Sequence, residues 1–280
     1  MSEQDPSHRR TVTTDIAFQI HTPSSFALQV RPAMSAGRIC TEELRIERED
    51  GGLAATSRPV AAENGGRIDM FDLTPGRVSI SYYAELAVPN AVVAPVAADA
   101  AYEQLVLQRP SRYCPSDHVV GFAGAEFGAA PSPGEQVRAI ASWIFERIRY
   151  VAGTTDVHDS AEHTLLTGQG VCRDFAHLGI VLCRALNIPA RFAAVYAPGL
   201  DPMDFHAVFE AWHDGAWWAY DATRKAPRAT LVRVATGRDA ADAPFASVTS
   251  GLADLLHLTV TATSGGNLPH DQHDALIALA

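Results

Sequence analysis

The sequence predicts an α+β fold in which an N-terminal β-sandwich precedes helices packed on an antiparallel sheet. Residues 11–88 alternate apolar and polar side chains, as half-buried strands do, and contain no convincing helical pattern. Residues 133–189 have the three- and four-residue apolar spacing of helices. Residues 190–263 return to strand patterns. Strands that precede and follow a helical block are typical of the α+β class.

Length and composition are those of a folded protein with more than one core. The chain has 280 residues, of which 47% are hydrophobic and 19% charged. Such values exclude a disordered or fibrous protein. Because this length exceeds the usual size of a single domain, we expect two domains, a β-sandwich over residues 1–105 and a second domain over residues 106–280.

Charge and cysteine usage narrow the classes of partner and cofactor. The 22 Lys and Arg against 32 Asp and Glu give a net charge of −10, and no basic run is longer than Arg9-Arg10. We therefore expect neither nucleic acid nor an anionic membrane as a partner. The four cysteines are scattered without a C-x-x-C pair, which predicts neither a zinc site nor a disulfide framework. No cofactor and no metal are expected, and the oligomeric state is left open.

Two features of the apolar pattern indicate the cellular compartment in which the protein is expected. The first ten residues are polar and charged and are not followed by the apolar segment of a secretory signal. No apolar run approaches the roughly 20 residues that a membrane-spanning helix needs. The cytoplasm is therefore the expected location.

The predicted sandwich contains short strands separated by turn residues. Asn64-Gly65-Gly66 and Thr74-Pro75-Gly76 supply turn chemistry, because glycine tolerates positive φ angles. The turn at Pro75 predicts that its two flanking strands form a hairpin. The expected strands cover residues 11–21, 26–31, 38–48, 67–73 and 77–88.

Proline-rich residues 89–115 predict a linking segment, after which the helices begin. Pro133-Gly134 opens a helix whose apolar positions recur with helical spacing. A second helix has an apolar stripe at Phe175, Leu178, Gly179, Leu182 and Leu186, and Pro189 ends it.

The second helix is preceded by glycines and has Cys172 in its first turn. Residues 168–178 read GQGVCRDFAHL. Unpaired N–H groups and the positive end of the helix dipole stabilise a thiolate, and the same N–H groups can bind an oxyanion. Arg173 and Asp174, in the same turn, are interpreted as internal supports of the site. Gln169 either donates to an oxyanion or shapes the loop.

A thiolate nucleophile needs a base, and the base needs an orienting group. His206 and Asp221 are the candidates, on strands predicted over residues 205–212 and 216–220. If Asp214-Gly215 is a two-residue type I′ loop, residue 213 pairs with residue 216, and the numbers of every pair of opposite residues sum to 429. In that register, His206 and Asp221 share a face of the sheet. A sum of 427 also places them on one face, whereas a three-residue loop with a sum of 428 would separate them.

These segments resemble the bacterial transglutaminase-like superfamily, which includes cysteine proteases. The resemblance is carried by residues 170–178 (GVCRDFAHL), 186–191 (LNIPAR), His206-Ala207 and 218–223 (WAYDAT), and it extends over about residues 105–264. The strand-rich start is similar to the β-domain that often precedes this core. The resemblance implies a papain-like core with Cys172 as nucleophile, His206 as base and Asp221 as its orienting carboxylate.

The expected function is that of a cysteine-dependent acyl-transfer enzyme. It would act on a peptide, protein or glutamine-type amide through a thioester, which passes to water in a protease or to an amine in a transglutaminase. One alternative is an acetyltransferase similar to the arylamine acetyltransferases, against which the β-rich N-terminal half counts. Another is a protein-interaction module that has kept the three residues without turnover.

Other cysteines and histidines receive a structural interpretation. Cys183 lies about three helical turns after Cys172 and is expected in the core. His158, His163 and His177 have spacings that fit no helical pair of metal ligands, so they are interpreted as solvated loop histidines.

Overall fold

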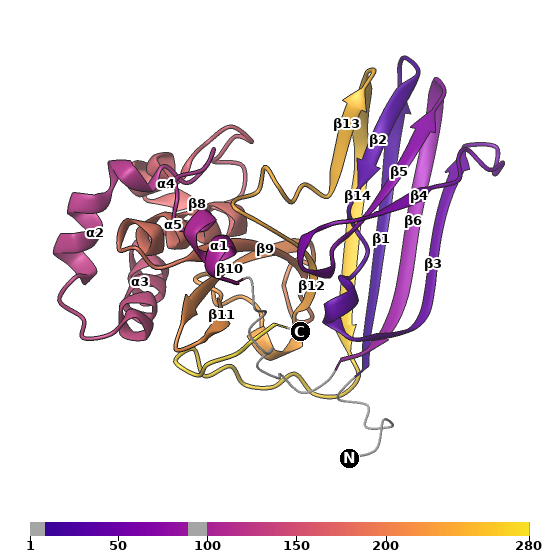
Figure 1. Cartoon of the computed structure of the whole chain (residues 1–280). Coiled ribbons are helices and arrows are strands. Elements are labelled where there is room, and N and C mark those ends of the chain that lie inside the picture. The colour runs from indigo at the N-terminus through magenta and orange to yellow at the C-terminus, as the bar shows by residue number, and fades with distance from the viewer. Residues whose placement is uncertain (1–8, 89–99, 280) are drawn as a thin grey trace.

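The computed structural model describes residues 9–88 and 100–279. The fold is α+β, as the sequence predicts: helices lie on one side, a four-stranded antiparallel sheet in the middle and a two-sheet β-sandwich on the other side (Figure 1). Residues 89–99 of the predicted linking segment and residues 1–8 lie outside the described residues. Within the described part, no helix is long and apolar enough to cross a membrane.

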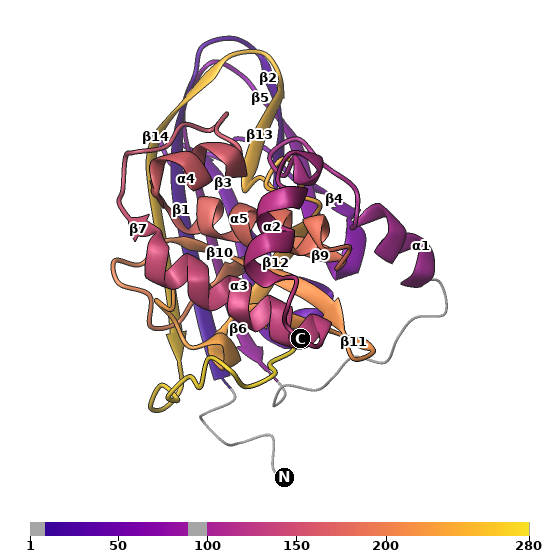
Figure 2. The same cartoon turned by 90° about the vertical axis from the view of Figure 1, so that its left-hand side faces the viewer.

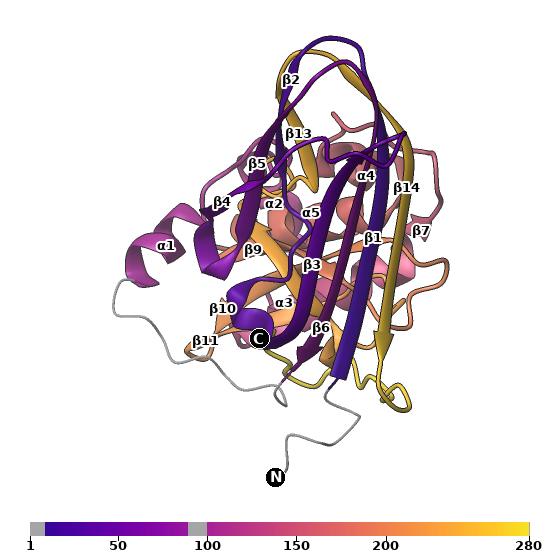
Figure 3. The same cartoon turned by 90° about the vertical axis from the view of Figure 1, so that its right-hand side faces the viewer.

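Two four-stranded sheets form the sandwich, with orders β14-β1-β6-β3 and β13-β2-β5-β4. The first sheet forms the outer face seen in Figure 3. Alternate side chains of both sheets, such as Ile16 and Phe26, are buried in one core. The strands are β1 (Arg9–Ile20), β2 (Ser24–Leu28), β3 (Arg38–Arg48), β4 (Arg58–Ala61), β5 (Arg67–Leu73), β6 (Gly76–Ala87), β13 (Ala246–Ser250) and β14 (Ala253–Ser264).

The predicted hairpin of residues 67–73 and 77–88 is wrong. β5 pairs with β2 and β4, whereas β6 pairs with β1 and β3. Phe71 of β5 and Ile80 of β6 are buried in the same core from opposite sheets. The turn at Pro75 therefore carries the chain across the core from one sheet to the other.

The last two strands of the chain complete the sandwich. β14 pairs with β1 along its length, and β13 pairs with β2. Strand patterns alone show that such a segment is extended, but not which edge it joins. The division into residues 1–105 and 106–280 stays a prediction, and strands of its second part are hydrogen-bonded to strands of its first.

The central sheet has the order β11-β10-β9-β12, and the helices cover one of its faces (Figure 2). The strands are β9 (Ala190–Tyr196), β10 (Phe205–His213), β11 (Ala216–Tyr220) and β12 (Val232–Gly237). The helices are α1 (Ala100–Val106), α2 (Val120–Phe127), α3 (Pro133–Arg147), α4 (Ala161–Thr167) and α5 (Cys172–Ala185). A short parallel pair, β7 (Arg149–Tyr150) and β8 (Gln169–Gly170), lies before α5.

Helix α5 is the centre of this half of the molecule. The sequence predicts one buried stripe, but every residue from Asp174 to Ala185 is buried, because α5 contacts β10 on one side and α2, α3 and α4 on others. A Cβ added at Gly179 would lie 2.4 Å from the ring of Phe209. Gly179 therefore lets β10, which carries His206, approach the helix closely.

Hydrogen bonds join the central sheet to the sandwich. The hydroxyl of Tyr196 in β9 bonds to Thr14 Oγ1 of β1 at 2.6 Å and donates to the Val30 carbonyl at 2.7 Å. All three groups are buried, which leaves no water to replace these bonds. The face of the central sheet opposite the helices is thus fixed against the sandwich.

A fully buried carboxylate strengthens the same region. Glu210 of β10 accepts two hydrogen bonds from Arg233 of β12, at 2.7 and 2.8 Å, and one from Arg191 of β9 at 2.8 Å. Arg191 also donates to Glu103 of α1 and Asn64 near β4. The cluster therefore links the central sheet to both flanking parts.

Candidate active site

The chain before Cys172 is shaped by two glycines. Gly168 ends α4 in the left-handed region, at φ 67°, which glycine adopts without strain. A Cβ added at Gly170 would lie 2.7 Å from Cβ of Asp174. This close approach allows the Asp174 side chain to fold back over the start of α5.

Asp174 is the internal support that the sequence predicts. Its Oδ2 accepts hydrogen bonds from the Val171 N–H at 2.9 Å and the Thr155 hydroxyl at 2.7 Å, and its Oδ1 accepts one from Arg173 at 2.8 Å. Arg173 also donates to the Asp156 carbonyl at 2.6 Å. The buried carboxylate thus ties the first turn of α5 to the loop at residues 155–156, and it fixes the backbone on which Cys172 lies.

The strand register predicted for the hairpin of β10 and β11 is confirmed. His213 pairs with Ala216, and Phe209 with Tyr220, so paired numbers sum to 429. Asp214 and Gly215 both have positive φ, 50° and 79°, as a type I′ loop requires.

This register brings His206 and Asp221 together. Nε2 of His206 donates to Oδ2 of Asp221 at 2.9 Å, and both side chains are almost completely buried, 0% and 1% exposed. The other carboxylate oxygen accepts from the N–H of Thr223 at 2.9 Å and from its hydroxyl at 2.7 Å. Burial opposes the charged carboxylate, but His206 and Thr223 outweigh it and lower the pKa of Asp221.

Cys172 interacts with the same histidine. Burial disfavours the imidazolium, yet the charge and hydrogen bond of Asp221, with a smaller contribution from Cys172, raise the pKa of His206 to about 10. Nε2 is engaged by Asp221, and Nδ1 has no hydrogen-bond partner among the described residues. Nδ1 is therefore the nitrogen available to the thiol.

Tyr150 is a residue of this site that the sequence analysis missed. Strand β7 aligns Tyr150 with Gly170, and the ring contacts Phe175 of α5 and the ammonium of Lys225, with centroid distances of 5.8 and 4.5 Å. Burial and the charge of Cys172 raise the pKa of its hydroxyl, and the nearby backbone N–H of Cys172 offsets part of this rise. A tyrosine shortly after the helix that Pro133-Gly134 opens is the available signal in the sequence, but a two-residue strand has no periodicity.

The interpretation of His177 as a solvated loop residue is wrong. His177 lies inside α5, fully buried, with its ring against Tyr113 and Phe192. Its Nε2 accepts the N–H of Ala240 at 3.1 Å, and burial lowers its pKa to about 4. His177 is thus a neutral core histidine.

The remaining candidates have structural positions. Cys183 is fully buried in the core, as expected. His158 is exposed in a turn, as expected, whereas His163 is partly exposed but lies in α4, so its interpretation as a loop residue is wrong. In residues 9–88 and 100–279, no three His, Cys, Asp or Glu side chains are grouped so that they could hold a metal ion.

A thiol at the start of a helix, next to a histidine–aspartate pair on the sheet that the helix covers, is the arrangement of transglutaminase-like α+β cores. Comparison with known proteins agrees with this class. Residues 123–222 match the transglutaminase-like superfamily, and this range includes Cys172, His206 and Asp221. A solved crystal structure is described as that of "a Putative Cysteine Protease from Cytophaga hutchinsonii", and its sequence is 34% identical to this chain. The two structures superpose with a TM-score of 0.83 over 94% of this chain and 92% of that one. The chain belongs to the transglutaminase-like superfamily.

Two mycobacterial relatives match a shorter part. The uncharacterized protein ML0607 of Mycobacterium leprae is 35% identical over 156 residues, which are 52% of this chain and 55% of that protein. The uncharacterized protein Rv2569c of Mycobacterium tuberculosis is 30% identical over 144 residues, 46% of each chain. The matched region thus spans about half the length of these curated relatives.

Proposed function

We propose that the protein is a cysteine-dependent acyl-transfer enzyme that acts on peptide or protein amides through a thioester. Cys172 is the nucleophile, His206 the general base and acid, and Asp221 the group that orients His206. One observation carries the assignment: His206 is buried and bonded through Nε2 to Asp221, while Nδ1 is left unbonded beside a thiol. The charge partner distinguishes His206 from the neutral core histidine His177, whose Nε2 bonds to a backbone N–H.

The proton of the Cys172 thiol passes to Nδ1 of His206 before substrate binds, which gives a thiolate beside the imidazolium that the raised pKa of His206 favours. The thiolate attacks the amide carbonyl carbon, a C–S bond forms, and the carbonyl electron pair moves to oxygen. The imidazolium then protonates the departing nitrogen, the C–N bond breaks, and a thioester remains on Cys172. Asp221 holds the ring orientation and stabilises the imidazolium throughout.

The negative oxygen of the intermediate needs hydrogen-bond donors near Sγ. The backbone N–H of Cys172 lies at the start of α5, near the Tyr150 hydroxyl. That N–H and the Tyr150 O–H are our candidates for the oxyanion site, because an oxygen bound between them would accept from both.

A second nucleophile completes the cycle. Water attacks the thioester and yields a carboxylic acid, or an amine attacks and yields a new amide; His206 takes the proton in both cases and the thiol is restored. We favour water, because no separate amine-binding feature is evident in the sequence and because the similar Cytophaga protein is described as a protease. A nucleophilic thiol must be kept reduced, which supports the cytoplasm as the compartment.

Turnover of a peptide-amide library, read by mass spectrometry with and without an added primary amine, tests this function. We expect new carboxylic acids with the native protein and none with Cys172→Ala. The matched control is Cys40→Ala, because Cys40 is exposed and distant in sequence from the site. Amine adducts in place of acids would assign the transglutaminase branch, and undiminished turnover by Cys172→Ala would refute the proposal.

A further inference from the structure

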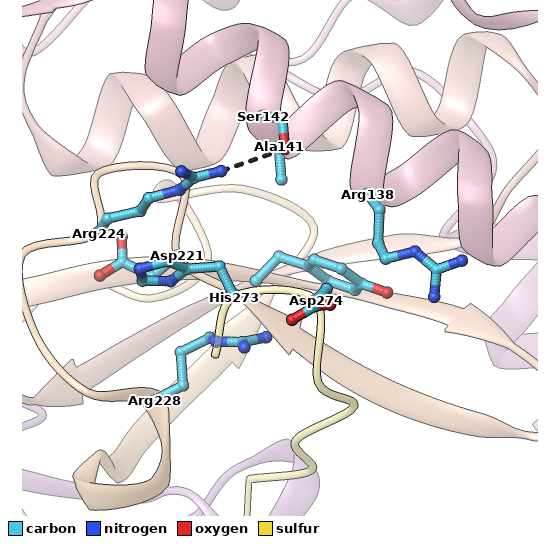
Figure 4. A pocket seen from close by; sticks show the side chains of 9 residues that line it. Arg138, Ala141, Ser142, Asp221, Arg224, Arg228, His273 and Asp274 are labelled. Atoms are coloured by element: carbon cyan, nitrogen blue, oxygen red, sulfur yellow. Dashed lines mark hydrogen bonds between the residues drawn. The ribbon is translucent and has the colours of Figure 1, made fainter. Parts of the chain in front are cut away.

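A cavity lies behind Asp221, between α3 and the C-terminal segment (Figure 4). Its volume is about 230 Å³. Because ligand sites for drug-sized molecules usually exceed about 300 Å³, this cavity fits a small molecule or one group of a larger one. Ala141 and Tyr220 contribute to its walls, and most of the other lining residues are charged.

Two arginines in the lining have no carboxylate partner. Arg138 extends from α3 on one side, and Arg224 lies on the other (Figure 4). Among the described residues, no carboxylate lies within ion-pair distance of either guanidinium. Arg224 donates to Ser142 Oγ at 3.1 Å and stacks on Phe145 at 4.1 Å from the ring centroid. These contacts hold its guanidinium in place and leave its charge unneutralised.

The other charges in the lining are mostly neutralised within the protein. Arg228 donates hydrogen bonds to the Asp271 carboxylate and to the carbonyls of Ala219 and Gln272. Asp221 is engaged by His206 and Thr223. Two unpaired arginines against the single carboxylate of Asp274 leave an excess of one positive charge. That excess matches a monoanion better than a dianion.

A buried histidine nitrogen in the same lining also lacks a partner. Nδ1 of His273 is buried without a hydrogen bond among the described residues; the nearest carboxylate oxygen, of Asp271, is at 3.8 Å. A buried polar atom of this kind is costly unless a ligand or water satisfies it. Figure 4 shows the His273 ring beside Asp221, at the Arg224 end of the cavity.

We propose that this cavity binds the carboxylate group of a small organic ligand, held between Arg138 and Arg224. Planar guanidinium groups bind carboxylates through paired hydrogen bonds, and the Ser142 hydroxyl is a further donor. Ala141 and the Tyr220 ring contact the organic part of the ligand. The bound carboxylate would lie beside Asp221, yet the site is independent of the proposed reaction because binding needs no turnover.

Benzoate and its neutral analogue benzamide test the site, because the two have similar size and differ in charge. Binding is measured on the full chain by saturation-transfer difference NMR at constant ionic strength. We expect saturable binding of benzoate and at least tenfold weaker binding of benzamide. Arg138→Gln and Arg224→Gln should each weaken benzoate binding at least tenfold. Arg147→Gln, which removes an exposed arginine from the same helix, should leave it unchanged.

Three outcomes would overturn the proposal: no saturable binding, equal binding of benzoate and benzamide, or equal loss in Arg147→Gln and Arg138→Gln. Tighter binding of inorganic phosphate than of benzoate would also overturn it, since the site would then prefer a dianion. If Arg224→Gln fails to fold, Arg138→Gln decides, because no contact within the protein depends on the Arg138 guanidinium among the described residues.

Discussion

His206 is enclosed by protein, and one carboxylate stabilises its charge. Its pKa in the folded protein is about 10, against 6.5 for an ordinary histidine. Because the folded pKa is the higher one, the pair stabilises the fold fully below pH 6.5, and this contribution is lost as the pH rises toward about 10. In the proposed reaction, the same pair would keep an imidazolium available to protonate the leaving amine at neutral pH.

Asp221→Asn should therefore shift the alkaline limb of the pH–rate profile to lower pH. The substitution removes the charge that raises the pKa of His206, and we expect the rate to fall at least 100-fold, on the scale of general acid–base catalysis. The profile of acyl transfer against pH measures both effects. Asp214→Asn, in the same hairpin but largely exposed, is the control. An unshifted alkaline limb in Asp221→Asn would contradict the assigned role.

Tyr150→Phe isolates the proposed oxyanion donor. The variant keeps the ring against Phe175 and Lys225 and removes only the hydroxyl. We expect kcat to fall about 10²- to 10³-fold, as the loss of one oxyanion donor does, with KM nearly unchanged. Steady-state kinetics separate the two constants. An unchanged kcat, or a loss confined to KM, would show that the hydroxyl has no such role.

The sequence predicts the groups of the proposed reaction, but it does not predict a group that lies beside them. Cys172, His206 and Asp221 were predicted because a helix start, a turn and a strand register have local signatures. Tyr150 reaches the site through a two-residue strand, and buried His177 is bonded to the backbone of Ala240, 63 residues away in sequence. Contacts of this kind depend on tertiary packing, which a pattern of single residues does not contain.

At the scale of elements, the site depends on how closely α5 lies against β10. Gly179→Ala would place a Cβ 2.4 Å from Phe209, so the helix and the strand must separate. We expect a loss of about 1–3 kcal/mol in the free energy of unfolding, typical of overpacking, together with lower reactivity of Cys172. Chemical denaturation and thiol alkylation measure the two effects.

The control for this variant is Gly124→Ala in α2, where nothing lies within 4 Å of the added Cβ. That substitution should be neutral or stabilise by up to about 1 kcal/mol through helix propensity. Equal stability of the two variants would show that the close approach of α5 and β10 is not required.

Elements with local turn chemistry were predicted well, and partners across the fold were not. Asp214-Gly215 fixes its hairpin because both residues adopt positive φ. Pro75-Gly76 permits a sharp turn as well, but the strands around it separate into two sheets. A strand with alternating buried residues can be followed by a strand of the same sheet or by one of the opposite sheet. The sequence pattern is the same in both cases and does not distinguish them.

At the scale of the molecule, the Glu210 cluster connects the central sheet to the parts on either side. Glu210→Gln would leave Arg191 and Arg233 buried without their shared counter-ion. Breaking a buried ion pair from one side costs about 3–5 kcal/mol, so we expect a loss of this order in the free energy of unfolding. Denaturant titration checks it, with Glu43→Gln in an exposed pair as the control, expected to change nothing measurable. Equal denaturant concentrations at the unfolding midpoints of Glu210→Gln and Glu43→Gln would contradict the prediction.

The Glu210 cluster also predicts how the free energy of unfolding changes in acid. The charges of Arg191 and Arg233 outweigh burial and lower the pKa of Glu210 to about 2, from an ordinary value of 4.5. Its contribution is therefore fully present above pH 4.5 and is lost as the pH falls toward 2. Because Glu210→Gln lacks this group, its stability should differ least from that of the native protein at the acid end of that range.

The architecture as a whole was only partly predictable. The α+β class follows from the order of periodicities along the chain. The return of β13 and β14 to the sandwich does not, since an extended apolar segment can join any free strand edge.

The most direct test of the central claim compares two thiols in one protein. Cys172 is half-buried beside His206, whereas Cys40 is exposed, and Cys114 and Cys183 are buried. Under limiting iodoacetamide at pH 6, quantified per cysteine by peptide mass spectrometry, we predict that Cys172 is alkylated at least tenfold faster than Cys40. In His206→Asn this preference should disappear. Faster alkylation of Cys40 in the native protein, or a preference for Cys172 that survives His206→Asn, would contradict the assignment of Cys172 and His206 as nucleophile and base.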